Sequence, residues 1–414
     1  MFMRLRSAFA DRSAAAAQGL PSARMRAALF ALRRGFPAFL PRFPMQMPDR
    51  RMFFQINWGL VFITILLFAV GMVNLYSASG SRIEGGFVLS PFYQRQFVWG
   101  LIGLAVMVTC MLIDYRRIER LAVPCYVVVL VLLMLVPIVG KTVYGAKRWI
   151  DLGVMNLQPS ELAKFAVLMM GAKALCRDGE SLGWKRLGQV LAIGVVPFLF
   201  IAKQPDLGSG LTVLVLLGGM VLFHGVKWKV LRVCLVVIPL VMPLGWFVLH
   251  DYQQERILTF LDPTRDPRGA GYHIIQSQIA IGSGEMFGKG FLAGTQSQLR
   301  FLPEKHTDFA IAVLGEEWGF AGCMTLVTLF CLFLMAMYST VRDAKDRFGS
   351  TLAAGIFFYF FWQIIVNIGM VVGLMPVVGM PLPFISYGGT ALVVNCALVG
   401  IVLSISMRRF VFKS

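Results

Sequence analysis

The sequence predicts an all-α membrane protein, a polytopic bundle of about ten transmembrane helices. Composition is the first reason: of 414 residues, 57% are hydrophobic and only 14% are charged, whereas soluble domains have roughly 45–50% and about 25%. The second reason is that the apolar residues occur in long runs. A helix of about 20 apolar residues crosses a bilayer while it satisfies its own backbone hydrogen bonds.

Ten apolar runs, separated by charged breaks, give the expected spans. They cover residues 58–76, 97–113, 121–139, 160–176, 186–202, 207–224, 230–249, 318–338, 352–375 and 384–406. One connection, residues 250–317, is far longer than the others, and a loop of that length is usually functional. Within it, residues 272–281 are expected to form a short amphipathic helix at the membrane surface. We assign residues 57–414 to one ten-span domain.

Residues 1–56 form a basic N-terminal tail. Its first 51 residues hold ten Arg, no Lys and two Asp. No apolar core is long enough for a cleavable signal peptide, so we expect this tail to be disordered or to lie on the membrane surface. Its composition also fits an Arg-rich transit peptide or translation from an upstream start.

The net charge of +18 would suit a nucleic-acid partner, but the Arg and Lys residues lie in short clusters between the apolar runs. Each expected inner segment carries three positive charges, and the outer loops carry fewer for their length. This asymmetry predicts that both termini are cytoplasmic, that the long loop is extracytoplasmic, and that no nucleic acid binds. The seven cysteines and four histidines lack the spacing of a zinc site, and the cysteines also lack that of a disulfide framework.

The strongest chemical signal lies at residues 301–309, just before an apolar segment. Four ionisable residues crowd together there: Glu304, Lys305, His306 and Asp308. A carboxylate at the outer membrane surface, shielded by lipid-facing neighbours, can act as a general base on a sugar hydroxyl, and Asp308 is our candidate. The alternative is that Thr307 and Asp308 only cap the following helix.

A second cluster begins with Arg148 and runs into the fourth expected span. Ser160 can serve as the N-cap of that span, and Glu161 and Lys164 share one helix face because they are three residues apart. Ionisable groups inside a span usually line a cavity or pair with each other, which favours a functional role. The alternative is a snorkelling Lys164 and a Glu161 stabilised by the helix dipole.

Two further polar residues lie near span ends. Asp206 belongs to a very short outer turn, which brings a carboxylate to the same side as Asp308, although the turn alone explains the residue. Ser386 lies where the last span opens, among small residues that let a backbone or a ligand approach closely. Close helix packing is the commoner reason for such residues.

Several of these strings resemble the SEDS family of shape, elongation, division and sporulation proteins. The likeness runs from about Asn57 to the C-terminus and rests on residues 147–164, GAGYHIIQS at 269–277, GTQSQ at 294–298, residues 301–309 and SYGG at 386–389. GAGYHIIQS, GTQSQ and a basic residue before His306 are typical of the RodA type. The FtsW type usually reads SYGGSS, where this chain has Thr390 and Ala391.

The resemblance implies an inverting peptidoglycan glycosyltransferase that joins lipid II into glycan strands during cell elongation and rod-shape maintenance. It implies a location in the bacterial inner membrane, with catalysis at the outer face. The implied partners are a class B penicillin-binding protein, other elongation-complex proteins and membrane lipid.

The resemblance also implies roles for single residues. Asp308 falls on the essential loop aspartate of the family, Glu161 and Lys164 on sensitive positions of the fourth span, and Arg148 on the basic loop before it. Lys164, Arg148 or a bound divalent cation, Mg²⁺ or Mn²⁺, is expected to stabilise the departing diphosphate.

Three alternatives remain open at the level of sequence. An FtsW-like division polymerase would share the chemistry. A lipid II flippase would move the lipid without making polymer, and it would more often show inverted repeats or broken helices, which we do not find in the sequence. A scaffold would only recruit other cell-wall proteins and would not need Asp308.

Overall fold

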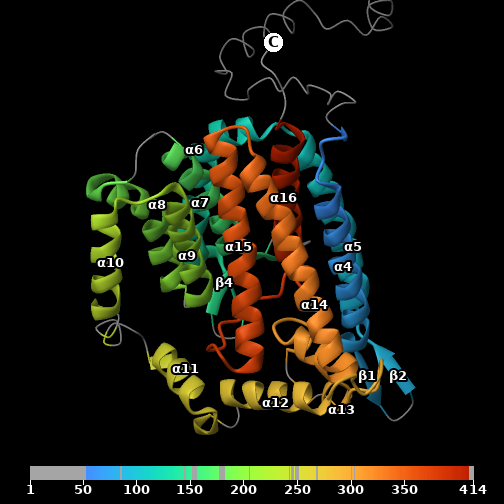
Figure 1. The fold of residues 1–414 in the computed structure, drawn as a ribbon. Helices are drawn as coiled ribbons and strands as arrows, with labels where there is room; N and C mark the ends of the chain where they lie inside the picture. Colours follow the sequence, from blue (N-terminus) through green and yellow to red (C-terminus); the bar gives the residue numbers. More distant parts are fainter. Residues whose placement is uncertain are drawn as a thin grey trace, which may run out of the picture. The chain divides into compact units, whose positions relative to one another are not determined.

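The computed structural model describes residues 53–409, except for 84–85, 144–145, 152–155, 177–181, 205, 242, 244–246, 248–250, 267–268, 300 and 303. Figure 1 shows long helices lying side by side as a bundle, with shorter helices gathered at one end. Residues 1–52, nearly all of the predicted N-terminal tail, lie outside the described residues, so the tail stays a prediction.

Eight of the described helices are long and apolar enough to cross a membrane. Each coincides with an expected span, which confirms the prediction of a polytopic helical membrane protein. They are α4 (Trp58–Ser79), α5 (Phe92–Leu112), α6 (Tyr115–Val139), α8 (Trp184–Lys203), α9 (Leu207–His224), α14 (Ala310–Asp343), α15 (Arg347–Val372) and α16 (Gly389–Met407).

The other two expected spans coincide with α7 (Pro159–Cys176) and α10 (Trp228–Val241). Helix α7 is long enough for a span but carries three charged side chains, two of which form a buried ion pair. Helix α10 has 14 residues, fewer than the roughly 20 that a span needs, and residues 242, 244–246, 248 and 249 of this expected span lie outside the described residues.

Several predicted helix ends were wrong. Helix α7 begins at Pro159, before the expected N-cap Ser160, and proline suits a first helical position. Helix α14 begins at Ala310 instead of residue 318 and bends at Gly319, whose φ of 63° interrupts the helix. Helix α16 begins at Gly389 instead of residue 384, so residues 381–388 form an irregular segment.

Five short strands were not predicted. Strands β1 (Gly80–Ile83) and β2 (Gly86–Leu89) form one antiparallel hairpin. Strands β3 (Lys141–Val143), β4 (Ala146–Asp151) and β5 (Asn156–Leu157) form a second small antiparallel sheet. Strands β1 and β2 connect α4 to α5, and β3, β4 and β5 connect α6 to α7.

The long connection before α14 is largely helical. It contains α11 (Asp251–Leu261), the 3₁₀ turn η2 (Pro263–Arg265), α12 (Ala270–Ser283) and α13 (Thr295–Gln298). Helix α12 confirms the helix predicted at residues 272–281 and lies across the end of the bundle in Figure 1. Of these elements, α11 and the start of α12 line the cavity that holds Asp308.

Small residues allow close packing in the membrane part of the bundle. A Cβ atom on Gly400 of α16 would lie 2.4 Å from the carbonyl oxygen of Met107 in α5, and a Cβ atom on Gly71 of α4 would lie 2.3 Å from that of Phe384. Any larger side chain would therefore separate these backbones. The second contact fixes residues 381–388 against α4.

Candidate active site

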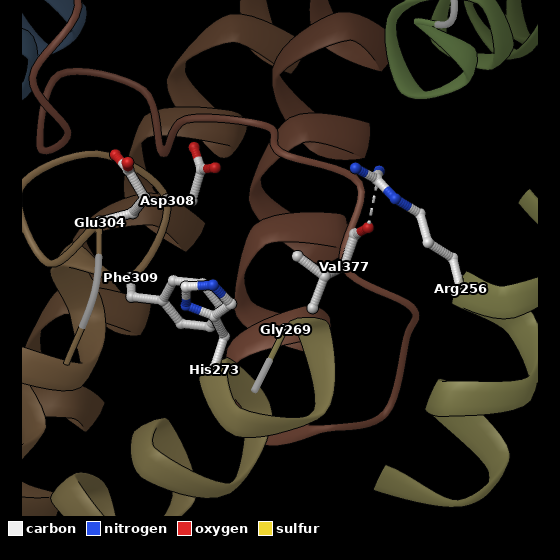
Figure 2. A pocket seen from close by; sticks show the side chains of 7 residues that line it. All are labelled: Arg256, Gly269, His273, Glu304, Asp308, Phe309 and Val377. Carbon is white, nitrogen blue, oxygen red and sulfur yellow. Dashed lines mark hydrogen bonds between the residues drawn. The ribbon is translucent and has the colours of Figure 1, made fainter. Parts of the chain in front are cut away.

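Asp308 lines a cavity of about 210 Å³ at the end of the bundle where α11 and α12 lie (Figure 2). Four separate parts of the chain build this cavity. Its walls are α11, the start of α12, the loop before α14 and the segment after α15. The lining residues are Arg256, Gly269, His273, Glu304, Asp308, Phe309 and Val377.

Asn367 of α15 holds two of these walls together. Its side-chain amide donates to the carbonyl oxygen of Asp308 at 3.0 Å and to that of Met380 at 2.7 Å. Gly379 has a φ of 72°, and a Cβ atom there would lie 3.5 Å from Asp308 Oδ2. The segment after α15 therefore covers the carboxyl group of Asp308 closely.

The surroundings of Asp308 favour its uncharged form more than water would. Burial raises the pKa of its carboxyl to about 6, the charge of Glu304 adds to the rise, and Arg256 opposes it. A carboxylate with a pKa near 6 is ionised at neutral pH but is a stronger base than an ordinary aspartate. This balance is what general-base catalysis needs.

The capping interpretation of Thr307 and Asp308 was wrong. The N-cap of α14 is Phe309, and no side chain makes a capping hydrogen bond there. The hydroxyl of Thr307 instead donates to the Glu304 carboxylate at 3.0 Å. Glu304 itself has a φ of 48°, and such left-handed backbone in a residue with a side chain is concentrated at functional sites.

Lys305 and His306, the other ionisable residues of the string, do not line the cavity. The ammonium of Lys305 donates to the carbonyl oxygens of Gly80, at 3.0 Å, and of Ser297. The His306 ring stacks on Phe92 with 4.6 Å between ring centroids. Burial lowers the pKa of His306, so it is uncharged at neutral pH. Both residues thus fix the loop that carries Asp308.

Glu161 and Lys164 also lie outside the set of lining residues. Their side chains form an ion pair of 2.6 Å inside the bundle, where Glu161 is 5% and Lys164 1% exposed. The Lys164 ammonium also lies 5.5 Å from the centroid of the Tyr359 ring on α15. The pair therefore links α7 to α15, which bears out the expectation that they would meet on one helix face.

The remaining predicted residues make structural contacts. Arg148 donates from Nε to the carbonyl oxygen of Gln204 at 3.2 Å, which ties β4 to the turn before α9. Asp206 caps α9 by accepting from the backbone N–H of Ser209 at 3.3 Å. The Ser386 hydroxyl accepts from the N–H of Leu382 at 2.8 Å and closes a turn before α16. None of them lines the Asp308 cavity among the residues that the structure describes.

Two polar lining residues had not been assigned any role from the sequence. His273 lies inside the GAGYHIIQS string, but nothing local indicates that it lines the cavity. Arg256 lies in an ordinary polar helix, 52 positions before Asp308. Only the arrangement of α11 and α12 brings them to the cavity.

Residues 58–410 match the family model of cell cycle proteins that comprises FtsW, RodA and SpoVE. The chain belongs to this family. The match covers every described helix, so the site residues all lie inside the family region.

Relatives within the family include peptidoglycan glycosyltransferases. MrdB of Escherichia coli K12 is 42% identical over 368 residues, which cover 87% of this chain and 97% of the relative. RodA of Treponema pallidum is 31% identical, covering 84% and 97%. A probable FtsW of Geobacter metallireducens is 38% identical, covering 84% and 94%.

Solved structures share the fold. The rod shape determining protein RodA of Thermus thermophilus is 30% identical, with a TM-score of 0.64 over 86% of this chain and 98% of that chain. A chain from a study of how a peptidoglycan synthase complex coordinates polymerisation and crosslinking is 32% identical, with a TM-score of 0.73 over 86% and 98%. The helical bundle of this chain therefore has the same fold as these solved structures.

Proposed function

We propose that this chain polymerises lipid II into glycan strands during cell elongation, with Asp308 as the general base. The enzyme class is that of its relatives, which are peptidoglycan glycosyltransferases. The observation that carries the assignment to Asp308 is its half-buried carboxyl group, which lines a cavity and has a raised pKa. Among the residues that the structure describes, the N-cap of α14 is Phe309 and Asp308 forms no ion pair.

The reaction is a displacement at the anomeric carbon of the lipid-linked donor. The 4-hydroxyl oxygen of the acceptor GlcNAc forms the new bond to that carbon while its proton moves to the Asp308 carboxylate. The bond from the carbon to the diphosphate oxygen breaks, and its electron pair leaves with the lipid diphosphate. The configuration at the carbon is inverted.

The cavity faces the outer side of the bacterial inner membrane in this proposal, and both termini are cytoplasmic. The charge distribution supports this orientation. Helix α14 starts two residues after Asp308, bends at Gly319 and ends at Asp343. Near its far end, a second cavity is lined by Arg116, Arg120 and Lys173, together with Glu119 and Asp346. An excess of basic residues marks the cytoplasmic side.

A divalent cation fits the Asp308 cavity if the substrate supplies part of its ligands. Within the described part of the chain, no group of three or more His, Cys, Asp or Glu could hold a metal. Glu304 would hold it, because Mg²⁺ is commonly bound by one or two carboxylates together with substrate phosphates, and Asp308 would stay free to accept the proton. The bound cation would supply positive charge to a substrate oxygen.

The proposed protein partner is a class B penicillin-binding protein, which would crosslink the new strands. Its support is the similar chain from a peptidoglycan synthase complex that coordinates polymerisation and crosslinking. Membrane lipid surrounds the bundle, and the other elongation-complex proteins complete the proposed set of partners.

The proposal is tested with purified protein in vesicles that contain fluorescent lipid II. Wild-type protein should form glycan strands that lysozyme degrades, and Asp308→Ala should form none. Movement of lipid II across the vesicle without polymer would indicate a flippase. Rescue of cell shape by Asp308→Ala in a strain that lacks the protein would indicate a scaffold. Either result would overturn the proposal.

A further inference from the structure

The charges in the Asp308 cavity lie on opposite walls. Figure 2 shows the carboxyl groups of Glu304 and Asp308 on one side and the guanidinium of Arg256 on the other. Below the two carboxyl groups in this view lie the rings of His273 and Phe309, which stack with 5.8 Å between centroids. The cavity therefore has an acidic wall, a cationic wall and an aromatic floor.

Among the seven described lining residues, Arg256 is the one that carries a full positive charge. The second basic residue, His273, is half-buried, and this burial lowers the pKa of its imidazole. Burial therefore favours the uncharged form of His273, and its buried Nδ1 has no hydrogen-bond partner among the described residues. An anion that enters the cavity is attracted by Arg256, and His273 adds a neutral polar contact.

The position of Arg256 is fixed by the segment after α15. Its Nη1 donates to the carbonyl oxygen of Val377 at 3.1 Å. A guanidinium has five N–H donors in a planar fork, which matches the geometry of phosphate oxygens. The group can keep the bond to Val377 and contact a phosphate at the same time. A lysine would offer a point charge without this fork.

We propose that Arg256 binds the diphosphate of the lipid-linked donor, so that its position opposite Asp308 sets the direction of sugar transfer. This inference rests on the proposed function. An inverting displacement needs the incoming oxygen and the leaving oxygen on opposite faces of the anomeric carbon. The acidic wall accepts the proton of the incoming hydroxyl, and the cationic wall receives the electron pair that leaves with the diphosphate oxygen.

The two cations expected from the sequence fit this role less well. Lys164 is 1% exposed and is paired with Glu161 at 2.6 Å, so binding a diphosphate would leave the buried Glu161 without its partner. Arg148 contacts the backbone of Gln204 and does not line the cavity. The residue that sequence reasoning missed is the one that faces Asp308.

Binding of small polyprenyl phosphates tests the inference without catalysis. Farnesyl diphosphate and farnesyl monophosphate are titrated against the full-length protein in detergent. The wild type should bind the diphosphate more tightly than the monophosphate. Arg256→Gln should weaken diphosphate binding about tenfold or more, the usual scale for losing a charged hydrogen-bond partner, and should reduce this preference. The affinity of Arg256→Lys for the diphosphate should lie between those of the wild type and Arg256→Gln.

Arg265→Gln is the matched control. Arg265 lies in η2, its side chain is 60% exposed, and it pairs with Asp262. It does not line the cavity, so this variant should bind both probes as the wild type does. If Arg256→Gln does not fold, Arg256→Lys decides the matter, because loss of the planar fork should still weaken diphosphate binding several-fold.

An unchanged preference for the diphosphate in Arg256→Gln, or in Arg256→Lys where only that variant folds, would overturn the inference. Asp308→Asn separates this failure from failure of the proposed function. It should bind farnesyl diphosphate but make no polymer. If it makes no polymer while the Arg256 variants bind normally, the function stands and the role of Arg256 falls. If it polymerises lipid II normally, the proposed function falls.

Discussion

Replacing Glu304 by glutamine should make Asp308 a base that works at lower pH. Glu304 lines the same cavity wall, and its negative charge contributes to the raised pKa of the Asp308 carboxyl. Glutamine keeps a side-chain oxygen that can accept the Thr307 hydroxyl, which donates to Glu304 at 3.0 Å. The substitution therefore removes the charge and preserves the local contact.

The size of the effect has a clear upper limit. The pKa of Asp308 rises from 3.8 to about 6, which corresponds to roughly 3 kcal/mol against ionisation. Burial is the largest cause of the rise and Glu304 is the second. Glu304→Gln should therefore move the pKa of Asp308 to a value below about 6 but still above 3.8.

The assay is the pH dependence of kcat/KM for lipid II polymerisation. The base must be ionised, so the wild-type rate should rise with pH through a midpoint near 6. In Glu304→Gln the acidic limb, the part of the pH profile where the rate rises, should move to lower pH. A limb that stays in place or moves to higher pH would refute the assigned role of the Glu304 charge. A wild-type profile without a limb near 6 would refute the role of Asp308.

Three other variants test the surrounding contacts. Arg256→Gln should move the acidic limb to higher pH, because the Arg256 charge lowers the pKa of Asp308; a shift to lower pH would contradict this. Lys305→Met should reduce kcat and leave the limb in place, because Lys305 binds backbone carbonyls outside the cavity; a moved limb would argue against a positioning role. Glu161→Gln should lower the free energy of unfolding by about 3–5 kcal/mol, because it leaves the buried charge of Lys164 unpaired. Adding Lys164→Met should restore part of that loss in thermal melts, and a double variant less stable than Glu161→Gln would contradict the pairing.

The membrane fold could be predicted because span length is a property of the sequence itself. A lipid core requires long apolar runs; all ten expected runs overlap described helices, and eight of these helices are long and apolar enough to span a membrane. Helix ends were harder to predict because distant partners decide them. Glu316 was assigned to a loop for its charge, but it is fully buried in α14 and accepts from Lys289 Nζ and from the backbone N–H groups of Gln296 and Ser297.

The site was predictable only where its residues are neighbours in the chain. Glu304 and Asp308 stand in one short string, so their crowding with other ionisable residues indicated a site. Arg256 and His273 come from other helices, and their approach depends on how α11 and α12 fold across the end of the bundle. The role first given to Lys164 stays a prediction, and the sequence does not reveal how closely its charge is paired with Glu161.

The central claim is that the Asp308 carboxylate removes the proton of the acceptor hydroxyl. It is tested most directly by the rate at which purified Asp308→Asn elongates fluorescent lipid II at a pH where the wild-type rate is maximal. Loss of a general base should lower that rate by about 10²–10⁴-fold, while the variant remains folded. Polymerisation within a few-fold of the wild-type rate would contradict the claim.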